Sequence, residues 1–198
     1  MSEGITPIRT SGRLRHDSLA MQSLSPRLDG YLPRFQWQTQ HSLESRASRE
    51  ACYDALVNAR SNNLLVSLLS NLRGLRSHGT LKESLLHNGF TLLEESPPDA
   101  LIVGLVCKPW IWSGEMSCHT GAEDWLSDNP AGFAKIVTVL GTESVRGTTL
   151  LYTETRVFVD DDKARKRFAL YWMLIKPFSG FIRWSWLRGA RNLAEHMM

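Results

Sequence analysis

The last 36 residues of the chain constrain its fold more than any other segment. Residues 160–162 are three aspartates, which favour the start of a helix because acidic groups interact well with the positive end of the helix dipole. Residues 163–198 then have the apolar spacing of a long helix, with a kink or break expected at residues 177–180, Pro-Phe-Ser-Gly. Residues 168–175 are apolar on every side, so more than one side must be buried. The rest of the fold has to supply a broad apolar partner.

The expected partner of this helix is an antiparallel sheet. Alternating polar and apolar residues, or short β-rich apolar runs, indicate strands. One of these runs is apolar on both faces and is expected in the centre of the sheet. The predicted strands are residues 35–43, 90–94, 100–108, 133–140 and 148–159, with turns at 96–99 and 141–147.

Short helices are predicted between the first strand and the second. Ser48 can cap a helix that follows it, and residues 62–75 offer a second helical stretch. Thr80 and Glu83 form a capping box, and the pair at 88–89, Asn-Gly, supplies a left-handed stop. The predicted fold class is therefore α+β.

Composition favours one folded domain preceded by a tail. The chain is 42% hydrophobic and 22% charged, as in ordinary globular proteins. Residues 1–30 have no periodic apolar face, so we expect a flexible tail there, whose loss costs little stability, and a domain over 31–198. The longest apolar run has eight residues, far fewer than the roughly 20 that cross a bilayer. Three cysteines without a CxxC pair suit free thiols and a cytoplasmic location.

Particular segments resemble the SRPBCC superfamily, and more narrowly its START-like and polyketide cyclase/dehydrase-like bacterial members. The segments are residues 104–110 (Gly-Leu-Val-Cys-Lys-Pro-Trp), 153–157 (Thr-Glu-Thr-Arg-Val) and 168–183, which contains the Pro-x-Ser-Gly break. Cys107 departs from the glycine usual in that group. The resemblance covers residues 31–198 and implies a helix-grip fold, in which a curved antiparallel sheet wraps around a long C-terminal helix. It also implies a cavity between sheet and helix for lipids, sterols, polyketides or similar molecules.

The candidate lining of that cavity is mostly aromatic and aliphatic, as in ligand pockets generally. A packed core with no cavity is the alternative interpretation of the same residues. Trp172 is expected in the centre of the fold and Trp184 at a rim, because Trp184 follows Arg183. The predicted ligand-binding residues are Val103, Leu105, Trp110, Trp112, Glu154, Arg156, Phe168, Tyr171, Trp172 and Ile175.

Glu154 and Arg156 lie two residues apart on a predicted strand, so their side chains share one face. If that face is concave, the two are polar anchors in the cavity. Glu154, together with Tyr171, is then the candidate general acid or base of a cyclase or dehydrase. If the face is convex, the pair is a surface or edge ion pair. The sequence leaves both possibilities open.

Neither a cofactor nor a metal is expected. The six histidines are dispersed without HxxxH spacing, and no GxGxxG or GxxxxGK[ST] motif occurs. Cys118 and His119 are adjacent in sequence, so their side chains are poorly placed to act as nucleophile and base.

The C-terminal helix is strongly basic. Residues 163–198 contain eight Lys and Arg against Glu195 alone, interleaved with aromatic residues. This pattern is typical of a solvated outer helix face. The alternative is transient contact with an anionic membrane surface, and nucleic acid is less favoured because no known reader fold is apparent. The predicted function is binding, with or without transfer, of a hydrophobic small molecule or lipid. The alternatives are a cyclase or dehydrase, and an interaction module with a filled core.

Overall fold

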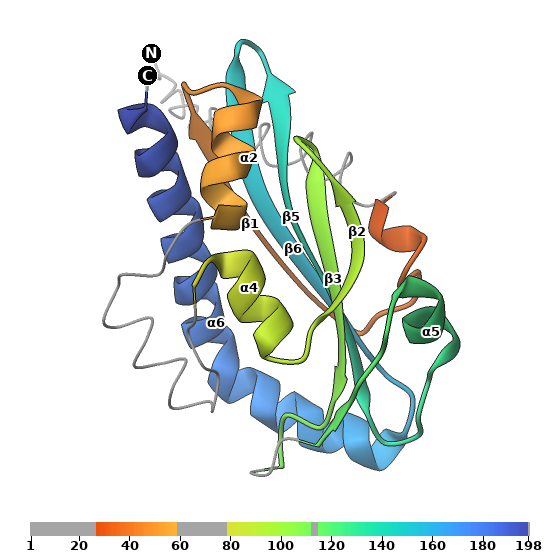
Figure 1. Ribbon diagram of the computed structural model, residues 1–198. Helices are drawn as coiled ribbons and strands as arrows, with labels where there is room; N and C mark the ends of the chain where they lie inside the picture. Colours follow the sequence, from red (N-terminus) through yellow and green to blue (C-terminus); the bar gives the residue numbers. More distant parts are fainter. Residues whose placement is uncertain (1–26, 59–78, 112–114, 198) are drawn as a thin grey trace, which may run out of the picture.

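The computed structural model describes residues 27–58, 79–111 and 115–197, and its centre is a six-stranded antiparallel sheet (Figure 1). The strand order is β1-β6-β5-β3-β2, and β4 pairs with β3. The strands are β1 (Trp37–Ser45), β2 (Thr91–Ser96), β3 (Ala100–Cys107), β4 (Met116–Ser117), β5 (Ala134–Val145) and β6 (Thr148–Val159). The helices are α2 (Arg49–Asn58), α4 (Leu81–His87), α5 (Ala122–Ser127) and α6 (Asp162–His196).

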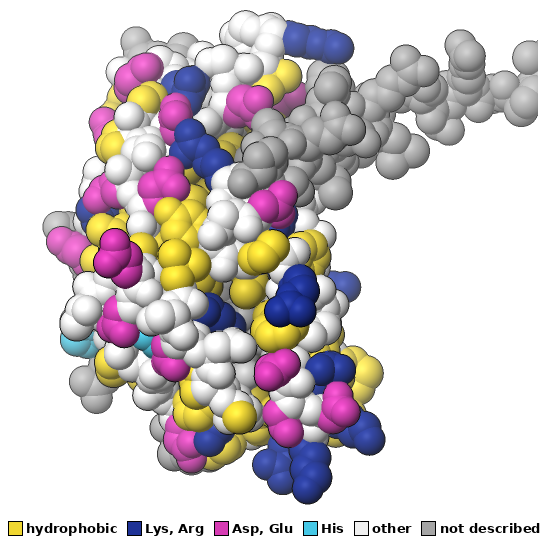
Figure 2. Space-filling view, turned by 90° about the vertical axis from the view of Figure 1, so that its right-hand side faces the viewer, with side chains coloured by type: hydrophobic (Ala, Val, Ile, Leu, Met, Phe, Trp, Pro, Cys, Tyr) yellow, Lys and Arg dark blue, Asp and Glu magenta, His cyan; other side chains and the backbone are white. Residues whose placement is uncertain are grey.

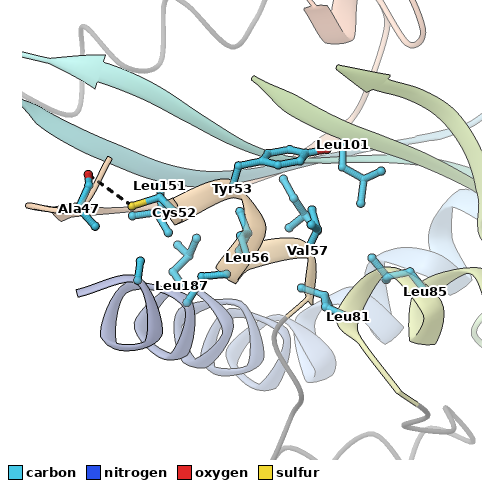
Figure 3. Close-up of a cluster of buried hydrophobic side chains, with 14 of the residues drawn as sticks. Ala47, Cys52, Tyr53, Leu56, Val57, Leu81, Leu85, Leu101, Leu151 and Leu187 are labelled. Atoms are coloured by element: carbon cyan, nitrogen blue, oxygen red, sulfur yellow. Dashed lines mark hydrogen bonds between the residues drawn. The ribbon is translucent and has the colours of Figure 1, made fainter. Parts of the chain in front are cut away.

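The sheet holds α6 together with two shorter helices on one face, which we call the inner face. Leu101 and Leu151 of the sheet pack there against Leu56 of α2, Leu85 of α4 and Leu187 of α6 (Figure 3). All five are buried below one tenth of their surface. The sheet and the 35-residue helix confirm the predicted α+β helix-grip fold.

The opposite, outer face of the sheet is also covered. Ile102, Val139 and Tyr152 point to this face and pack against Trp125 of α5 and Leu28. Gly104 makes this packing possible, because a Cβ atom there would lie 2.6 Å from the Trp125 indole. Both faces are therefore buried, which explains why β3 is apolar throughout.

Several local signals in the sequence act as predicted. Thr80 Oγ1 accepts a hydrogen bond from the Glu83 backbone N–H, and the Glu83 carboxylate accepts one from Thr80 N–H, so the capping box is complete. Asp161 caps α6 by accepting from Ala164 N–H at 2.7 Å. The predicted helix at residues 62–75 lies outside the described residues.

The hairpin of β5 and β6 differs from the prediction. Residues 141–145 belong to β5 and pair with β6, so the connection shrinks to Arg146 and Gly147. Both have positive φ, 50° and 87°, as a tight two-residue hairpin turn of type I′ requires. Two 12-residue strands result, and they are the longest in the sheet.

Of the kink or break predicted at residues 177–180, the break does not occur. Pro177 lies inside α6, which continues to His196. Proline removes one backbone donor and bends a helix without ending it when packing holds both halves. Figure 1 shows α6 changing direction along its length as it passes from the lower end of the sheet up beside α2.

The folded part of the chain begins earlier than residue 31. Leu28 is fully buried, and Arg27 forms ion pairs with Glu94 at 3.2 Å and Asp99 at 2.9 Å. The sequence did not indicate that Leu28 is buried, because a single leucine cannot form a periodic apolar pattern. The other residues of the expected tail, 1–26, lie outside the described residues.

Leu28→Ala should therefore lower the free energy of unfolding by about 2 to 5 kcal/mol, the usual cost of emptying a buried leucine site. Urea denaturation measures the loss, and Leu126→Ala, at an exposed leucine of α5, is the matched control with little expected effect. Equal losses would contradict this placement of Leu28. Deleting residues 1–28 should destabilise the fold for the same reason.

The aromatic residues of α6 should differ sharply in their contribution to stability. Phe168 is 1% exposed, Trp172 is partly buried and Trp184 is exposed. Phe168, not Trp172, is thus the buried centre, and Phe168→Ala should cost about 3 to 5 kcal/mol. Trp184→Ala should cost much less, and urea denaturation of both variants measures the difference. A loss for Trp184→Ala as large as that for Phe168→Ala would contradict the orientation of α6.

Candidate functional site

A band of polar side chains crosses the inner face of the sheet, where apolar residues would be expected. Thr39 lies opposite Thr155 across the β1–β6 pairing, His41 opposite Thr153, and Thr138 opposite Thr155 across β5–β6. Side chains two apart on a strand share a face, so these residues form one patch. With two residues of α6 they make up what we call the polar belt: Thr39, His41, Thr138, Thr153, Thr155, Ser179 and Arg183.

Arg183 connects α6 to this patch. Its guanidinium donates to Thr155 Oγ1 at 2.6 Å and to Ser179 Oγ. Thr155 Oγ1 also shares a 2.7 Å hydrogen bond with Thr138 Oγ1. Thr138, Thr155 and Ser179 are all buried, so the helix meets the sheet here through hydrogen bonds.

Two hydroxyls of the polar belt have no hydrogen-bond partner among the described residues. They are Thr39 Oγ1 and Thr153 Oγ1, and Thr153 is fully buried. A buried polar group left without a partner costs about 1 to 3 kcal/mol. Thr153 therefore offers an unused donor and acceptor to a polar atom that reaches the inner face.

His41 is held in its neutral form. Burial lowers its pKa from the ordinary value of 6.5, and the positive charge of Arg183 lowers it further. Gly180 of α6 lies beside the imidazole, since a Cβ atom there would be in ordinary contact with His41 Cε1 at 3.4 Å. A neutral imidazole has one donor and one acceptor, so His41 can hydrogen-bond a neutral polar group.

The structure brings most of the predicted aromatic lining together, beside the first half of α6. The Phe168 ring lies 5.6 Å from Trp172, 5.9 Å from Tyr171 and 6.1 Å from Trp110, between ring centroids. Trp37 of β1, which was not predicted here, is nearer still at 4.6 Å. These five residues form the aromatic cluster, and they pack against one another.

The other predicted lining residues are placed less uniformly. Val103 is fully buried on the inner face, and Leu105 is buried two residues further along the same strand. Ile175 is partly exposed on α6, and Trp112 lies outside the described residues. Val103 and Leu105 therefore remain candidate contacts for a molecule on the inner face.

Glu154 and Arg156 point to the outer face, away from α6. Arg156 Nε donates to Glu154 Oε1 at 2.8 Å, and Gln38 and Gln40 donate to the same carboxylate at 2.7 and 2.9 Å. Arg156 also donates to Asp29 Oδ1 at 2.6 Å. Glu154 and Arg156 are at most 1% exposed, so they form neither polar anchors on the inner face nor a surface ion pair. This correction removes Glu154 as an acid or base for a molecule beside α6.

Cys118 and His119 follow β4, and the His119 imidazole lies beside Asp128. His119 Nε2 lies 2.7 Å from Asp128 Oδ2, which also accepts from Ser117 Oγ at 2.9 Å, while Cys118 is exposed. Within the described part of the chain, no three His, Cys, Asp or Glu side chains are grouped so that they could hold a metal ion.

The sequence contained a signal for the polar belt that its interpretation missed. Thr153 and Thr155 share one face of β6 with Leu151 and Val157, which stand on either side of them. Threonine is common in strands for conformational reasons, so its hydroxyls do not mark a polar site in a strand pattern. Arg183 is one of eight basic residues in 163–198, and no periodicity separates it from the others.

Comparisons with known proteins leave the family open. No protein-family model matches the chain, and no curated protein matches it. Among solved structures, a conserved protein from Geobacillus kaustophilus is similar at 15% identity and a TM-score of 0.41, over 80% of this chain and 96% of that one. Ara h 8.0201 is similar at 10% identity and a TM-score of 0.29, over 78% and 97%. The helix-grip fold rests on the strand order and the packing of α6.

Arg183→Met should raise the pKa of His41, because it removes a neighbouring positive charge. Burial is the larger cause and persists, so the pKa should stay below 6.5. NMR titration of the imidazole measures the change, and Arg188→Met, whose guanidinium lies over the Trp184 ring, should leave it unaltered. A pKa that falls in Arg183→Met would contradict the contact.

The stability of the wild-type protein should also depend on the protonation of His41. As pH falls below 6.5 the imidazole takes up a proton in the unfolded chain before it does so in the folded one, so His41 should reduce the free energy of unfolding.

Proposed function

We propose that this protein binds a hydrophobic small molecule or lipid between the inner face of the sheet and α6. The observation that carries the proposal is the fully buried Thr153 hydroxyl, which has no hydrogen-bond partner among the described residues. A polar atom of a ligand would satisfy it. The resemblance to the SRPBCC superfamily, whose members hold such molecules in this position, supports the same proposal. A cytoplasmic location belongs to it as well, on the ground of three free thiols.

The surroundings of Thr153 favour a ligand that is apolar except for one polar group. On one side of the polar belt lies the aromatic cluster, and on the other lie Val103 and Leu151 with the leucines of α2 and α6. His41 and Arg183 supply further hydrogen-bonding atoms within the belt. Pockets that bind small molecules combine an apolar lining with a few placed polar groups in this manner.

The cyclase or dehydrase alternative required Glu154 as its general acid or base. Glu154 is engaged by Gln38, Gln40 and Arg156 on the outer face, so it cannot reach a proton of a substrate on the inner face. Binding without a chemical step therefore requires fewer assumptions.

The interaction-module alternative is favoured by the aromatic cluster. Its rings contact one another, as they do in a filled core. In that case the inner face would hold no ligand, and Thr153 would simply tolerate an unmade hydrogen bond. The two functions predict different masses for the native protein, because only ligand binding adds the mass of a bound molecule.

Native mass spectrometry of the purified full-length chain tests the proposal. We expect a non-covalent adduct that disappears on denaturation, and extraction with organic solvent should release a hydrophobic compound. Thr153→Val keeps the shape of the side chain and removes the hydroxyl, so it should reduce the adduct. It should leave the stability of the ligand-free protein unchanged or higher, because no internal hydrogen bond is lost.

Thr138→Val is the matched control for that variant. Thr138 donates to or accepts from Thr155 at 2.7 Å, so its loss should lower the free energy of unfolding by about 1 kcal/mol. If the protein carries no adduct and both valine variants lose equal stability, the Thr153 hydroxyl is satisfied within the fold. The filled-core interpretation would then replace the proposal.

A further inference from the structure

The side of α6 that faces away from the sheet carries large apolar side chains in the open. Leu170, Met173 and Leu174 are 64 to 69% exposed. The positions recur at intervals of three and four, so they follow one side of the helix. We call this set the apolar stripe: Leu170, Met173, Leu174, Phe178, Phe181 and Trp184.

The apolar stripe is separate from the residues of α6 that hold the fold together. Phe168, Ile182 and Leu187 are buried toward the sheet. A helix that buries one apolar side and exposes a second needs a partner for the second, since exposed contiguous apolar surface usually marks an interaction site. Burial within the described residues does not supply that partner.

The charges around the apolar stripe indicate the chemistry of the partner. Lys163, Lys166 and Arg167 are exposed just before it, and Lys176 and Arg188 are exposed beside it and after it. Between Asp162 and Glu195 the helix has no acidic residue. Figure 2 shows Lys and Arg side chains, with Asp and Glu among them, at the lower end of the molecule, where α6 begins in Figure 1. Apolar side chains flanked by cations fit an anionic lipid surface.

A second copy of this chain fits the same surface less well. Two copies of α6 packed antiparallel across the stripe would bring Lys166 and Arg167 of each against Arg188 and Arg191 of the other. A parallel arrangement would place identical cations together. Like charges across an interface are costly, whereas anionic headgroups neutralise both ends of the stripe.

We propose that α6 docks the protein on an anionic bilayer through the apolar stripe. The helix lies in the plane of the interface, with the stripe among the upper acyl chains and its cations at the headgroups. No helix in the described part of the chain has the length and apolar content to cross a membrane, so the contact is peripheral. The proposal does not depend on a ligand at Thr153.

Co-sedimentation of the full chain with vesicles tests this docking. We expect binding to vesicles of phosphatidylcholine with phosphatidylserine, weakened by salt, and little binding to phosphatidylcholine alone. Leu174→Glu, at a 69% exposed position, should reduce the partition coefficient by roughly tenfold or more. Leu126→Glu, which adds the same charge at an exposed leucine of α5, should retain most of the binding.

Three results would overturn the proposal. One is wild-type protein that ignores anionic vesicles at low salt, and another is equal loss of binding in Leu174→Glu and Leu126→Glu. The third is a wild-type dimer, measured by light scattering, that Leu174→Glu converts to a monomer, because a second copy would then cover the stripe. Lys166→Glu should also weaken vesicle binding, because it replaces a cation beside the apolar stripe with an anion. The Lys166 side chain is exposed on α6, so this substitution should leave the core unchanged.

Discussion

The structure depends on the burial of both faces of one antiparallel sheet. Strand β6 shows the constraint most clearly, since all of its residues are buried or half-buried on one face or the other. It pairs along its full length with β5, and residues 149–157 pair with β1. Successive side chains point to opposite faces, so a shift of one residue would send Glu154 toward α6 and Thr153 to the outer face. Two sets of contacts prevent that shift. The helices pack on the inner face, and the N-terminal segment packs on the outer face.

Each face uses its polar groups differently. On the outer face Glu154 and Arg156 neutralise each other. Glu154 also accepts hydrogen bonds from Gln38 and Gln40, and Arg156 donates one to Asp29, as buried charges require. On the inner face the polar groups are hydroxyls, one imidazole and one guanidinium, and Thr153 keeps an unused hydroxyl. The outer network therefore holds the N-terminal segment on the sheet, whereas the inner belt is the part of the sheet with capacity for a further partner.

Helix α6 contributes residues to both the polar belt and the apolar stripe. Its inner side contributes Ser179 and Arg183 to the polar belt, and its outer side carries Phe178 and Phe181 into the apolar stripe. Pro177 lies inside the helix just before these positions and does not end it. A bilayer that held the outer side would thus touch the same turns of helix that close the inner face. A hydrophobic ligand and a lipid surface are chemically compatible neighbours in such an arrangement.

Apart from β4 and α5, which it did not predict, the sequence by itself determined the types of the described elements. It also determined the capping box at Thr80, the start of α6 and the presence of two faces on β6, because these follow from local spacing and local hydrogen bonds. It did not determine which face meets the helix. The answer lies in contacts such as Arg156 with Asp29, 127 residues apart, and Arg183 with Thr155 across the sheet–helix interface. A strand's two faces are locally equivalent, so only the elements packed against them decide that Thr153 faces α6 and that Glu154 is buried with Arg156 on the outer face.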